Sequence, residues 1–250
     1  GGAAVIVAVG GDGTVNDVLN GLTNFEQVTF AYIPSGSGND LARGLHLETD
    51  PLKALEQILS GGQMGRIRIG ELSTPAFSRR FLVSSGLGFD AAVCEGALHS
   101  KFKKFLNQFH LGKLTYTGIA LKEIFLSRCP KAKLILDNDT VIETPTLLFA
   151  SAMNLPYEGG GFQFCPEADS KDDHLDLILV EKMPKLKVFL LLPTAFFGKH
   201  TRFRGIHIHT FREARLVTEQ PLFLHTDGEI PGKTSEVVWR LLPEALTIIL

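Results

Sequence analysis

The sequence of 250 residues, 44% of them hydrophobic, is long enough for one large domain or two small ones with a sizeable core. Its 25 Lys and Arg against 27 Asp and Glu give a net charge of −2, which excludes a global field favouring nucleic acid or anionic lipid, so any membrane contact must be local. The three cysteines, Cys94, Cys129 and Cys165, are odd in number and far apart, which argues against a disulfide framework or a zinc knuckle and favours a reducing cytosol.

The first predicted element is a strand that enters a glycine-rich turn and then a helix. Residues 3–9 are uninterrupted Ala, Val and Ile, typical of a strand buried on both faces. Gly-Gly-Asp-Gly-Thr follows at 10–14, and residues 15–22 carry one apolar helical stripe. Glycine amides and a helix N-terminus bind anions, so the turn predicts a phosphate site. A carboxylate beside phosphate needs a cation between them, so we expect Asp12 to face Mg²⁺, directly or through water.

The same pattern occurs a second time. Residues 30–33 predict another strand, and Pro-Ser-Gly-Ser-Gly-Asn-Asp-Leu-Ala-Arg-Gly-Leu at 34–45 holds a second glycine-rich turn whose Asn-Asp pair opens an apolar helical segment. Together the two stretches resemble the diacylglycerol kinase catalytic domain family, in its bacterial soluble lipid-kinase branch. Sphingosine and ceramide kinases share this outline, whereas NAD kinases share the first element only.

The rest of the chain changes character after one more helix. Asp50 and Pro51 form an N-cap and first-position pair for a helix with Leu52, Leu55, Ile58 and Leu59 inward, which ends at Gly61-Gly62. From residue 65 the pattern predicts an antiparallel domain, interrupted by helical stretches at about 113–126 and 185–197. Its predicted strands are 66–72, 80–84, 133–142 folded at 137–139, 146–153, 175–180, 205–211, 214–218, 222–226 and 236–241.

The resemblance implies a fold class of α/β plus mainly-β. An α/β nucleotide-binding domain, here residues 1–64 and truncated at its start, precedes a β-sandwich-like lipid-substrate domain at 65–241. Residues 242–250 return to the first domain, and the active site lies in the cleft between the two. The family usually opens with further strands and helices, so we expect the chain to be a fragment, or its first strand to pair with another subunit in a homo-oligomer.

Thr226-Asp227-Gly228-Glu229 matches the family's Asp-Gly-Glu motif. The match implies that Glu229 is the general base that takes the proton from the substrate hydroxyl. A carboxylate in a partly desolvated cleft can reach a pKa useful for this task. The same residues also fit a type I′ hairpin turn built on Asp-Gly, and the two glycine-rich turns favour the catalytic interpretation.

Residues 166–177 resemble the family's segment that holds a structural Mg²⁺. The match implies the side chain of Asp172 as a ligand, with backbone carbonyls from Asp169 and His174. Asp173 stands where the family usually has Gly, so the turn is expected to be strained or shifted. An acidic solvated loop is the alternative.

Two other segments stay open between two interpretations. Lys-Phe-Lys-Lys-Phe at 101–105 is either an interfacial membrane contact or a core-facing Phe stripe with a basic outer face. Gly-Gly-Gly at 159–161 is either a mobile loop near the substrate or a plain surface turn.

The predicted function is an ATP-dependent and Mg²⁺-dependent lipid kinase that phosphorylates the hydroxyl of a diacylglycerol-like lipid at the membrane surface. Asp12 and Asp40 organise metal and phosphate, and Glu229 is the base. The alternatives are an NAD kinase-like small-molecule kinase and a non-catalytic regulator that binds nucleotide or lipid. The predicted cofactor-binding residues are Gly10, Gly11, Asp12, Gly13, Thr14, Asn16, Gly36, Ser37, Gly38 and Asn39, of which Thr14 and Asn16 fix the first turn.

The sequence shows no targeting or spanning segment. Residues 1–9 lack a basic n-region, and the apolar run at 188–197 is broken by Pro193 and falls short of the ~20 residues that span a bilayer. We therefore expect a cytoplasmic protein without a transmembrane segment and without a nucleic-acid partner, in peripheral contact with the inner face of the membrane.

Overall fold

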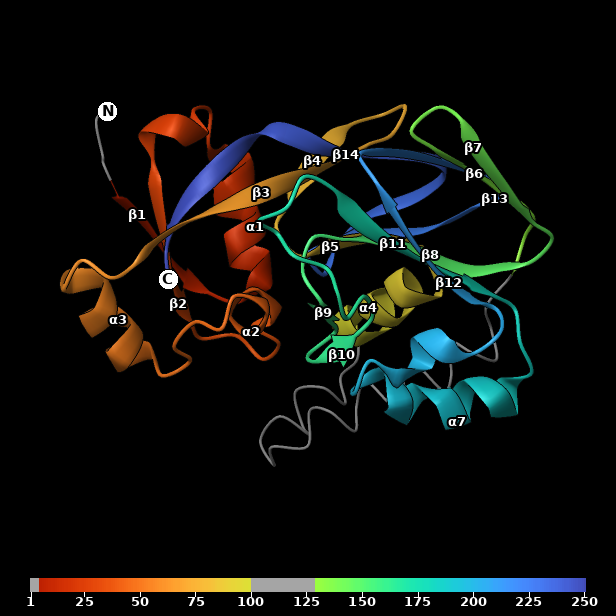
Figure 1. The fold of residues 1–250 in the computed structure, drawn as a ribbon, viewed down its shortest axis with the longest axis horizontal. Helices are drawn as coiled ribbons and strands as arrows, with labels where there is room; N and C mark the ends of the chain where they lie inside the picture. Colours follow the sequence, from red (N-terminus) through yellow and green to blue (C-terminus); the bar gives the residue numbers. More distant parts are fainter. Residues whose placement is uncertain (1–4, 100–128) are drawn as a thin grey trace.

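The computed structural model describes residues 5–99 and 129–250 (Figure 1). The helix predicted at 113–126 and the Lys-Phe segment at 101–105 lie outside these residues. Figure 1 shows an N-terminal part built on short helices and strands beside a larger part made mainly of strands.

The N-terminal part alternates strands and helices, as predicted. β1 and β2 pair in parallel, from Val5 opposite Thr29 to Gly10 opposite Pro34. Because they pair in register, both strands end at one edge of the sheet, and the two glycine-rich turns that follow lie side by side. The elements are β1 (Val5–Gly10), α1 (Asp12–Gly21), η1 (Phe25–Gln27), β2 (Thr29–Pro34), α2 (Asp40–Gly44) and α3 (Pro51–Leu59).

The larger part is mainly antiparallel, as the sequence predicts. The two strands predicted at 214–218 and 222–226 are one strand, β13, whose register shifts between Val217 and Leu222. The elements are β3 (Met64–Ser73), β4 (Ser78–Phe81), β5 (Ser84–Gly88), α4 (Phe89–His99), β6 (Ala132–Leu136), β7 (Thr140–Thr144), β8 (Leu147–Met153), β9 (Tyr157–Glu158), β10 (Phe162–Gln163), β11 (Leu175–Glu181), α7 (Lys185–Ala195), η2 (Lys199–Arg202), β12 (Ile206–Phe211), β13 (Glu213–Thr226) and β14 (Glu229–Ile249).

One long strand joins the two parts. β14 pairs with β13 and β3, and its last residues run parallel to β2, with Thr247 opposite Thr29 and Ile248 opposite Phe30. The described sheet has the order β1-β2-β14-β13-β5-β8-β11-β12. Because one sheet crosses both parts, the domain boundaries at residues 64 and 241 stay a prediction.

Each part has its own apolar core. The core of the first part contains fully buried Leu19, Phe30 and Leu41. In the second part the strands curve around a core that contains Trp239 and Phe211. These two cores confirm the predicted fold class, an α/β domain followed by a β-sandwich-like domain. Among the described residues, no helix combines the length and apolar character needed to cross a bilayer.

Two predictions of burial are wrong. The sequence predicts a first strand buried on both faces, but Val5, Val7 and Val9 are 43%, 41% and 59% exposed, because α1 packs on one face of β1 and these alternate residues point to the other. In α3, Leu52, Leu55 and Leu59 are expected inward but are 73%, 40% and 77% exposed, because the helix packs toward β2 on the side of its buried residue Ala54.

Candidate active site

The two glycine-rich turns touch each other along their backbones. The N–H of Ser35 donates to the carbonyl of Gly10 at 2.8 Å. A Cβ added to Gly36 would lie 2.5 Å from the Cα of Gly11, so only glycine allows this approach. The two turns therefore form one wall of a cavity of about 250 Å³, and residues of the second part form the rest of its lining.

The structure divides the predicted cofactor-binding residues into two groups. Those that line the cavity are Gly11, Asp12, Gly13, Gly36, Ser37 and Gly38. Gly10, Thr14, Asn16 and Asn39 are not among its lining residues.

Asn39 holds the second turn in shape. Its backbone is in the left-handed region, with φ of 51°. Its Oδ1 accepts hydrogen bonds from the N–H of Gly36 at 3.0 Å and from the hydroxyl of Tyr32 at 3.1 Å, and its Nδ2 donates to the carbonyl of Gly36 at 3.0 Å. Asn39 therefore shapes the turn through its side chain.

Asp12 links the first turn to the helix that follows the second. Its carboxylate accepts the backbone N–H groups of Asp40 and Leu41, each at 3.1 Å, and so caps the N-terminus of α2. Asp12 also lines the cavity, where its Oδ2 would lie 3.1 Å from a Cβ added to Gly38. The side chain thus has a structural function that the sequence does not reveal, and its contact with Mg²⁺ stays a prediction.

Asp40 is only 6% exposed and connects the two parts of the protein. Its Oδ2 accepts the N–H of Gly160 at 2.8 Å, from the glycine loop of the second part. Its Oδ1 is buried and accepts no hydrogen bond from the described residues, while Nε of Arg43 lies 3.7 Å away. Burial, together with the negative charge of Asp12, raises the pKa of Asp40 to about 7. The glycine loop lines the cavity through Gly159 and Gly160.

Glu229 reaches the cavity from a tight hairpin. Asp227 and Gly228 have φ of 46° and 85°, as a type I′ turn between β13 and β14 requires. The type I′ hairpin that the sequence offered as the alternative is therefore present, and the same turn also lines the cavity of the candidate active site. A Cβ at Gly13 would clash with the carboxylate of Glu229, so Glu229 lies against the first glycine-rich turn.

Asp227 is the residue that the sequence analysis missed in this motif. Its buried carboxylate accepts the N–H groups of Leu82 at 3.1 Å, Val83 at 2.9 Å and Ser84 at 3.0 Å. Burial raises the pKa of Asp227, although these hydrogen bonds and the one from Asn16 oppose the shift. Asp227 therefore ties the Glu229 hairpin to the segment between β4 and β5.

Asn16 is fully buried and is not among the residues that line the cavity. Its Nδ2 donates to Asp227 at 2.8 Å and to the carbonyl of Arg80 at 2.9 Å, and its Oδ1 accepts from Nε of Arg79 at 2.6 Å. Asn16 therefore links α1, β4 and the hairpin, and its contact with the cofactor stays a prediction.

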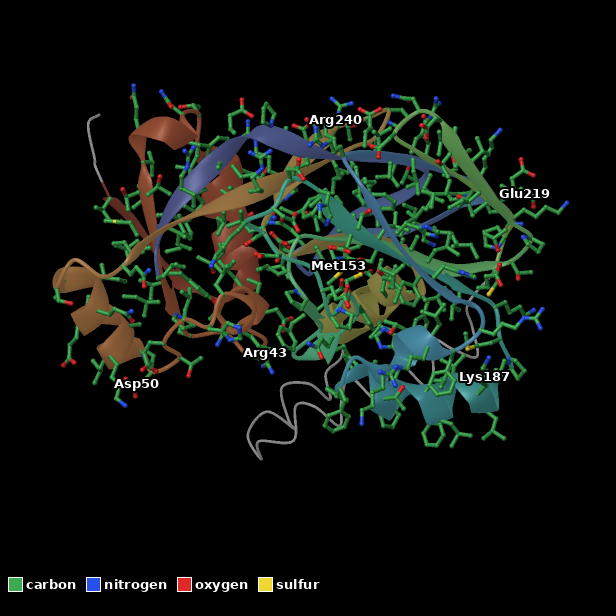
Figure 2. All side chains as sticks on the ribbon, viewed as in Figure 1. Arg43, Asp50, Met153, Lys187, Glu219 and Arg240 are labelled. Atoms are coloured by element: carbon green, nitrogen blue, oxygen red, sulfur yellow. The ribbon has the colours of Figure 1, made fainter. Side chains whose placement is uncertain are left out.

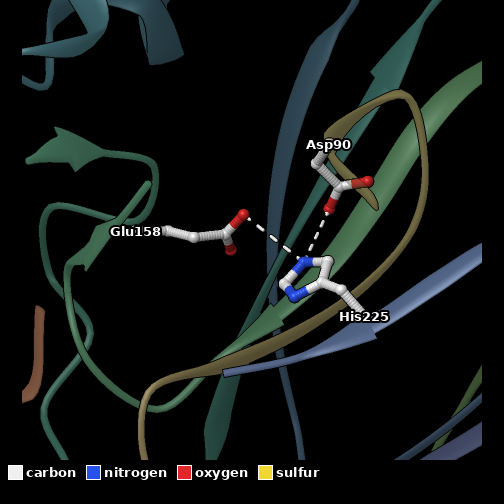
Figure 3. A group of neighbouring side chains, drawn as sticks. All are labelled: Asp90, Glu158 and His225. Carbon is white, nitrogen blue, oxygen red and sulfur yellow. Dashed lines mark hydrogen bonds and ion pairs between the residues drawn. The ribbon is translucent and has the colours of Figure 1, made fainter. Parts of the chain in front are cut away.

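A second cluster of polar side chains consists of Asp90, Glu158 and His225 (Figure 3). Nε2 of His225 in β13 is 3.1 Å from Oδ2 of Asp90 in α4 and 3.4 Å from Oε1 of Glu158 in β9. Burial alone would lower the pKa of His225, but the charges of Glu158 and Asp90 hold it well above its usual value. Glu158 also lines the cavity and accepts the hydroxyl of Ser151 at 3.1 Å. No local pattern could reveal this cluster, because its members come from three distant elements.

The acidic segment predicted to bind structural Mg²⁺ is closed by its own contacts. Oδ1 of Asp172 accepts the N–H of His174 at 3.1 Å, its Oδ2 is 3.2 Å from Nε2 of His174, and the carbonyl of Asp169 accepts the N–H of Asp172 at 3.2 Å. Asp173 pairs with Arg212 and is not among the residues with positive φ, so the expected strain at this position is wrong. Metal binding here stays a prediction.

Two family models match the chain. The model of the YegS C-terminal NAD kinase beta sandwich-like domain matches residues 83–250. The model of the diacylglycerol kinase catalytic domain matches residues 1–72.

A similar protein is a diacylglycerol kinase of Staphylococcus saprophyticus, 28% identical over 231 residues that cover 92% of this chain and 71% of that protein. Two solved structures share the fold. A diacylglycerol kinase from Bacillus anthracis has a TM-score of 0.69 at 20% identity, over 98% of this chain and 76% of that one. An NAD kinase from Archaeoglobus fulgidus in complex with ATP has a TM-score of 0.53 at 13% identity, over 99% of this chain and 78% of that one.

Proposed function

Since this chain belongs to the family of the YegS C-terminal NAD kinase beta sandwich-like domain and matches the diacylglycerol kinase catalytic domain before it, we propose that it is a lipid kinase that transfers the γ-phosphoryl group of ATP to the hydroxyl of a diacylglycerol-like lipid. One observation carries this proposal: both glycine-rich turns meet the carboxylates of Asp12, Asp40 and Glu229 at one cavity. Phosphoryl transfer depends mainly on positioning and charge neutralisation, which amides, carboxylates and a metal supply.

The backbone of the first turn is suited to phosphate. Gly11 is the N-cap of α1 and has no side-chain cap, so N–H groups of the first turn of this helix stay available to a ligand. Gly36, Ser37 and Gly38 add the second turn to the same wall. We assign the phosphates of ATP to this wall.

Asp40 and Asp12 fit a divalent cation. The Oδ1 of Asp40 is a buried oxygen that accepts no hydrogen bond from the described residues, and the second carboxylate beside it adds negative charge. Such oxygens are the ligands that Mg²⁺ prefers. When bound, Mg²⁺ would neutralise the charge that develops on the transferred phosphoryl group.

Glu229 is the proposed general base. Its carboxylate lies against Gly13 in the first turn, at the point where the hairpin from the second part enters the cavity. A lipid hydroxyl between this carboxylate and the γ-phosphoryl group would give up its proton to Glu229 as it attacks. Asp227 keeps the hairpin in place through its hydrogen bonds to Leu82, Val83 and Ser84.

The proposal is tested by incubating the protein with ATP, Mg²⁺ and a mixed lipid extract and identifying the phosphorylated products by mass spectrometry. Glu229→Gln should lower kcat by about 10²-fold with little change in ATP affinity, because it keeps the shape and removes the proton acceptor. Glu219→Gln is the matched control, since Glu219 is an exposed residue of β13 outside the cavity (Figure 2). Phosphorylation of NAD without lipid, or ATP binding without turnover, would contradict the proposal.

We also propose which residues bind each substrate, where the enzyme acts and how it assembles. We assign residues 1–64 to nucleotide and 65–241 to lipid, at the membrane surface on the cytoplasmic side. Among the described residues β1 pairs only with β2 and forms an edge of the sheet, which supports pairing with a second subunit as a homo-oligomer. Light scattering of the purified chain measures this directly, and a monomer at all concentrations would contradict it.

A further inference from the structure

Helix α7 and the segment after it present large apolar side chains to solvent. Leu186, Leu190 and Phe197 are 70%, 62% and 72% exposed. Phe189 and Phe203 are 45% and 40% exposed. We call these five residues the α7 surface. In Figure 2 the helix, marked by Lys187, lies at the lower edge of the molecule with side chains directed outward.

The opposite side of α7 is apolar as well. Leu191 and Ala195 are buried, and Val188 and Leu192 pack against the core below the helix. A helix on the surface of a globular protein normally carries polar residues on its outer face, but here leucine and phenylalanine occupy that face. A contiguous exposed apolar patch of this kind indicates a binding surface.

The segment of sequence that carries the α7 surface has charges of one sign. Residues 182–204 contain six basic residues and no Asp or Glu, although the whole chain has a net charge of −2. The basic residues are Lys182, Lys185, Lys187, Lys199, Arg202 and Arg204. Apolar side chains within a positive segment are complementary to an anionic lipid surface. The apolar side chains enter the acyl boundary, and the basic side chains meet the anionic headgroups.

Two stacked phenylalanine rings connect the end of α7 to the glycine loop of the candidate active site. Phe196, next to Phe197, stacks on Phe162 of β10 with ring centroids 4.1 Å apart. Phe162 directly follows the glycine loop, whose Gly160 donates to Asp40 at 2.8 Å. Contact with a bilayer at α7 would therefore bring the cavity close to the lipid surface.

We propose that the α7 surface docks on an anionic phospholipid bilayer. This inference deepens the proposed lipid kinase function, because it names the place where the enzyme meets its substrate. The partner is identified by the exposed Leu and Phe side chains together with the positive segment around them. Binding to the bilayer through these two features does not require a strong net charge on the rest of the protein.

Vesicle co-sedimentation tests the proposal without nucleotide. The chain should bind vesicles of phosphatidylcholine with one third phosphatidylglycerol, bind pure phosphatidylcholine at least about tenfold more weakly, and lose affinity as salt screens the charges. Leu186→Ser with Leu190→Ser should weaken binding about tenfold or more, because less apolar surface is buried in the bilayer. Lys185→Gln with Lys199→Gln should also weaken it about tenfold or more, since each basic residue contributes about fivefold.

Matched controls separate the α7 surface from general effects. Leu52→Ser with Leu59→Ser replaces two equally exposed leucines of α3, and Lys53→Gln with Lys133→Gln removes two exposed charges elsewhere. Neither control should change vesicle binding by more than about twofold. Equal losses in the controls and the α7 variants, or equal binding to both kinds of vesicle, would overturn the proposal. So would light scattering that shows the leucine pair of α7 to be the contact between two copies of the chain.

Turnover separates this inference from the function on which it rests. The α7 leucine variant should phosphorylate a short-chain, water-soluble diacylglycerol at the wild-type rate but lose about tenfold on the same lipid embedded in anionic vesicles. Vesicle binding by a wild-type chain without kinase activity would leave docking intact and refute the proposed function. Full activity of the variant on embedded lipid would overturn docking alone.

Discussion

Replacement of Gly13 by Ala is expected to separate stability from activity. Gly13 lies in the first turn of α1, where a Cβ would clash with the carboxylate of Glu229. Gly13 is not among the residues with positive φ, so alanine adopts the same backbone without strain. Because the end of a glutamate side chain moves easily, the clash should displace the Glu229 carboxylate and leave the helix intact.

The expected effects of Gly13→Ala on stability and on kcat differ in sign and size. Alanine in place of glycine within a helix stabilises it by up to about 1 kcal/mol, which raises the Tm of a chain of this size by roughly 2–4 °C. Displacement of a general base lowers kcat by about 10²-fold, or about 3 kcal/mol of transition-state stabilisation. Gly21→Ala is the matched control, because nothing lies within 4 Å of a Cβ at Gly21 and the residue belongs to the same helix.

The assay combines thermal unfolding with initial rates of lipid phosphorylation. Gly13→Ala should keep or raise Tm and lose about 10²-fold in kcat, while Gly21→Ala keeps its kcat. If the loss acts through Glu229, Gly13→Ala combined with Glu229→Gln should be no slower than Glu229→Gln alone. A kcat for Gly13→Ala within about twofold of the Gly21→Ala value, or losses that multiply in the double variant, would refute the reasoning.

Three further predictions concern buried and acidic side chains. Asp227→Asn should lower the free energy of unfolding by about 3 kcal/mol in urea titrations, because the NH₂ group of its amide would face two other donors, the N–H of Leu82 and the Nδ2 of Asn16. An unchanged urea midpoint would contradict this prediction. Burial raises the pKa of Asp40 to about 7, so the folded protein loses stability as pH rises from about 4 to 7. Without Mg²⁺, Asp40→Asn should be as stable as wild type at pH ~4 and more stable at pH ~8, by at most about 4 kcal/mol. A stability difference that stays constant with pH would exclude the effect. In an Asp40→Asn background, which removes the proposed Mg²⁺ ligand in the cavity, Mg²⁺ should still raise Tm and Asp172→Ala should remove that increment. An equal increment with and without Asp172→Ala would show that Asp172 is not a ligand.

The two glycine-rich turns and the Asp-Gly-Glu hairpin could be predicted because their backbone geometry is local. Gly11 and Gly36 lie where two backbones approach closely, Gly13 leaves room for the carboxylate of Glu229, and glycine is visible in any sequence. The helix capped by Asp50 was predicted for the same reason, and its side chain accepts the N–H groups of Leu52 and Lys53. Local periodicity could not assign burial, because it does not say which element covers a face. Val7 and Leu59 were predicted to be buried for this reason, and both are exposed.

The sequence by itself therefore determined the order of strands and helices, the two turns and the residue types available for phosphoryl transfer. Only the tertiary structure decided which side chains meet at the site. Asn16 reaches Asp227 across 211 positions and His225 reaches Asp90 across 135, so no spacing rule could pair them. Burial raises the pKa of Asp40, whereas the charges of Glu158 and Asp90 raise the pKa of His225 against the opposite effect of burial. Neither shift can be read from the sequence, because the dielectric and the neighbouring charges around a carboxylate or an imidazole exist only once distant strands have packed together.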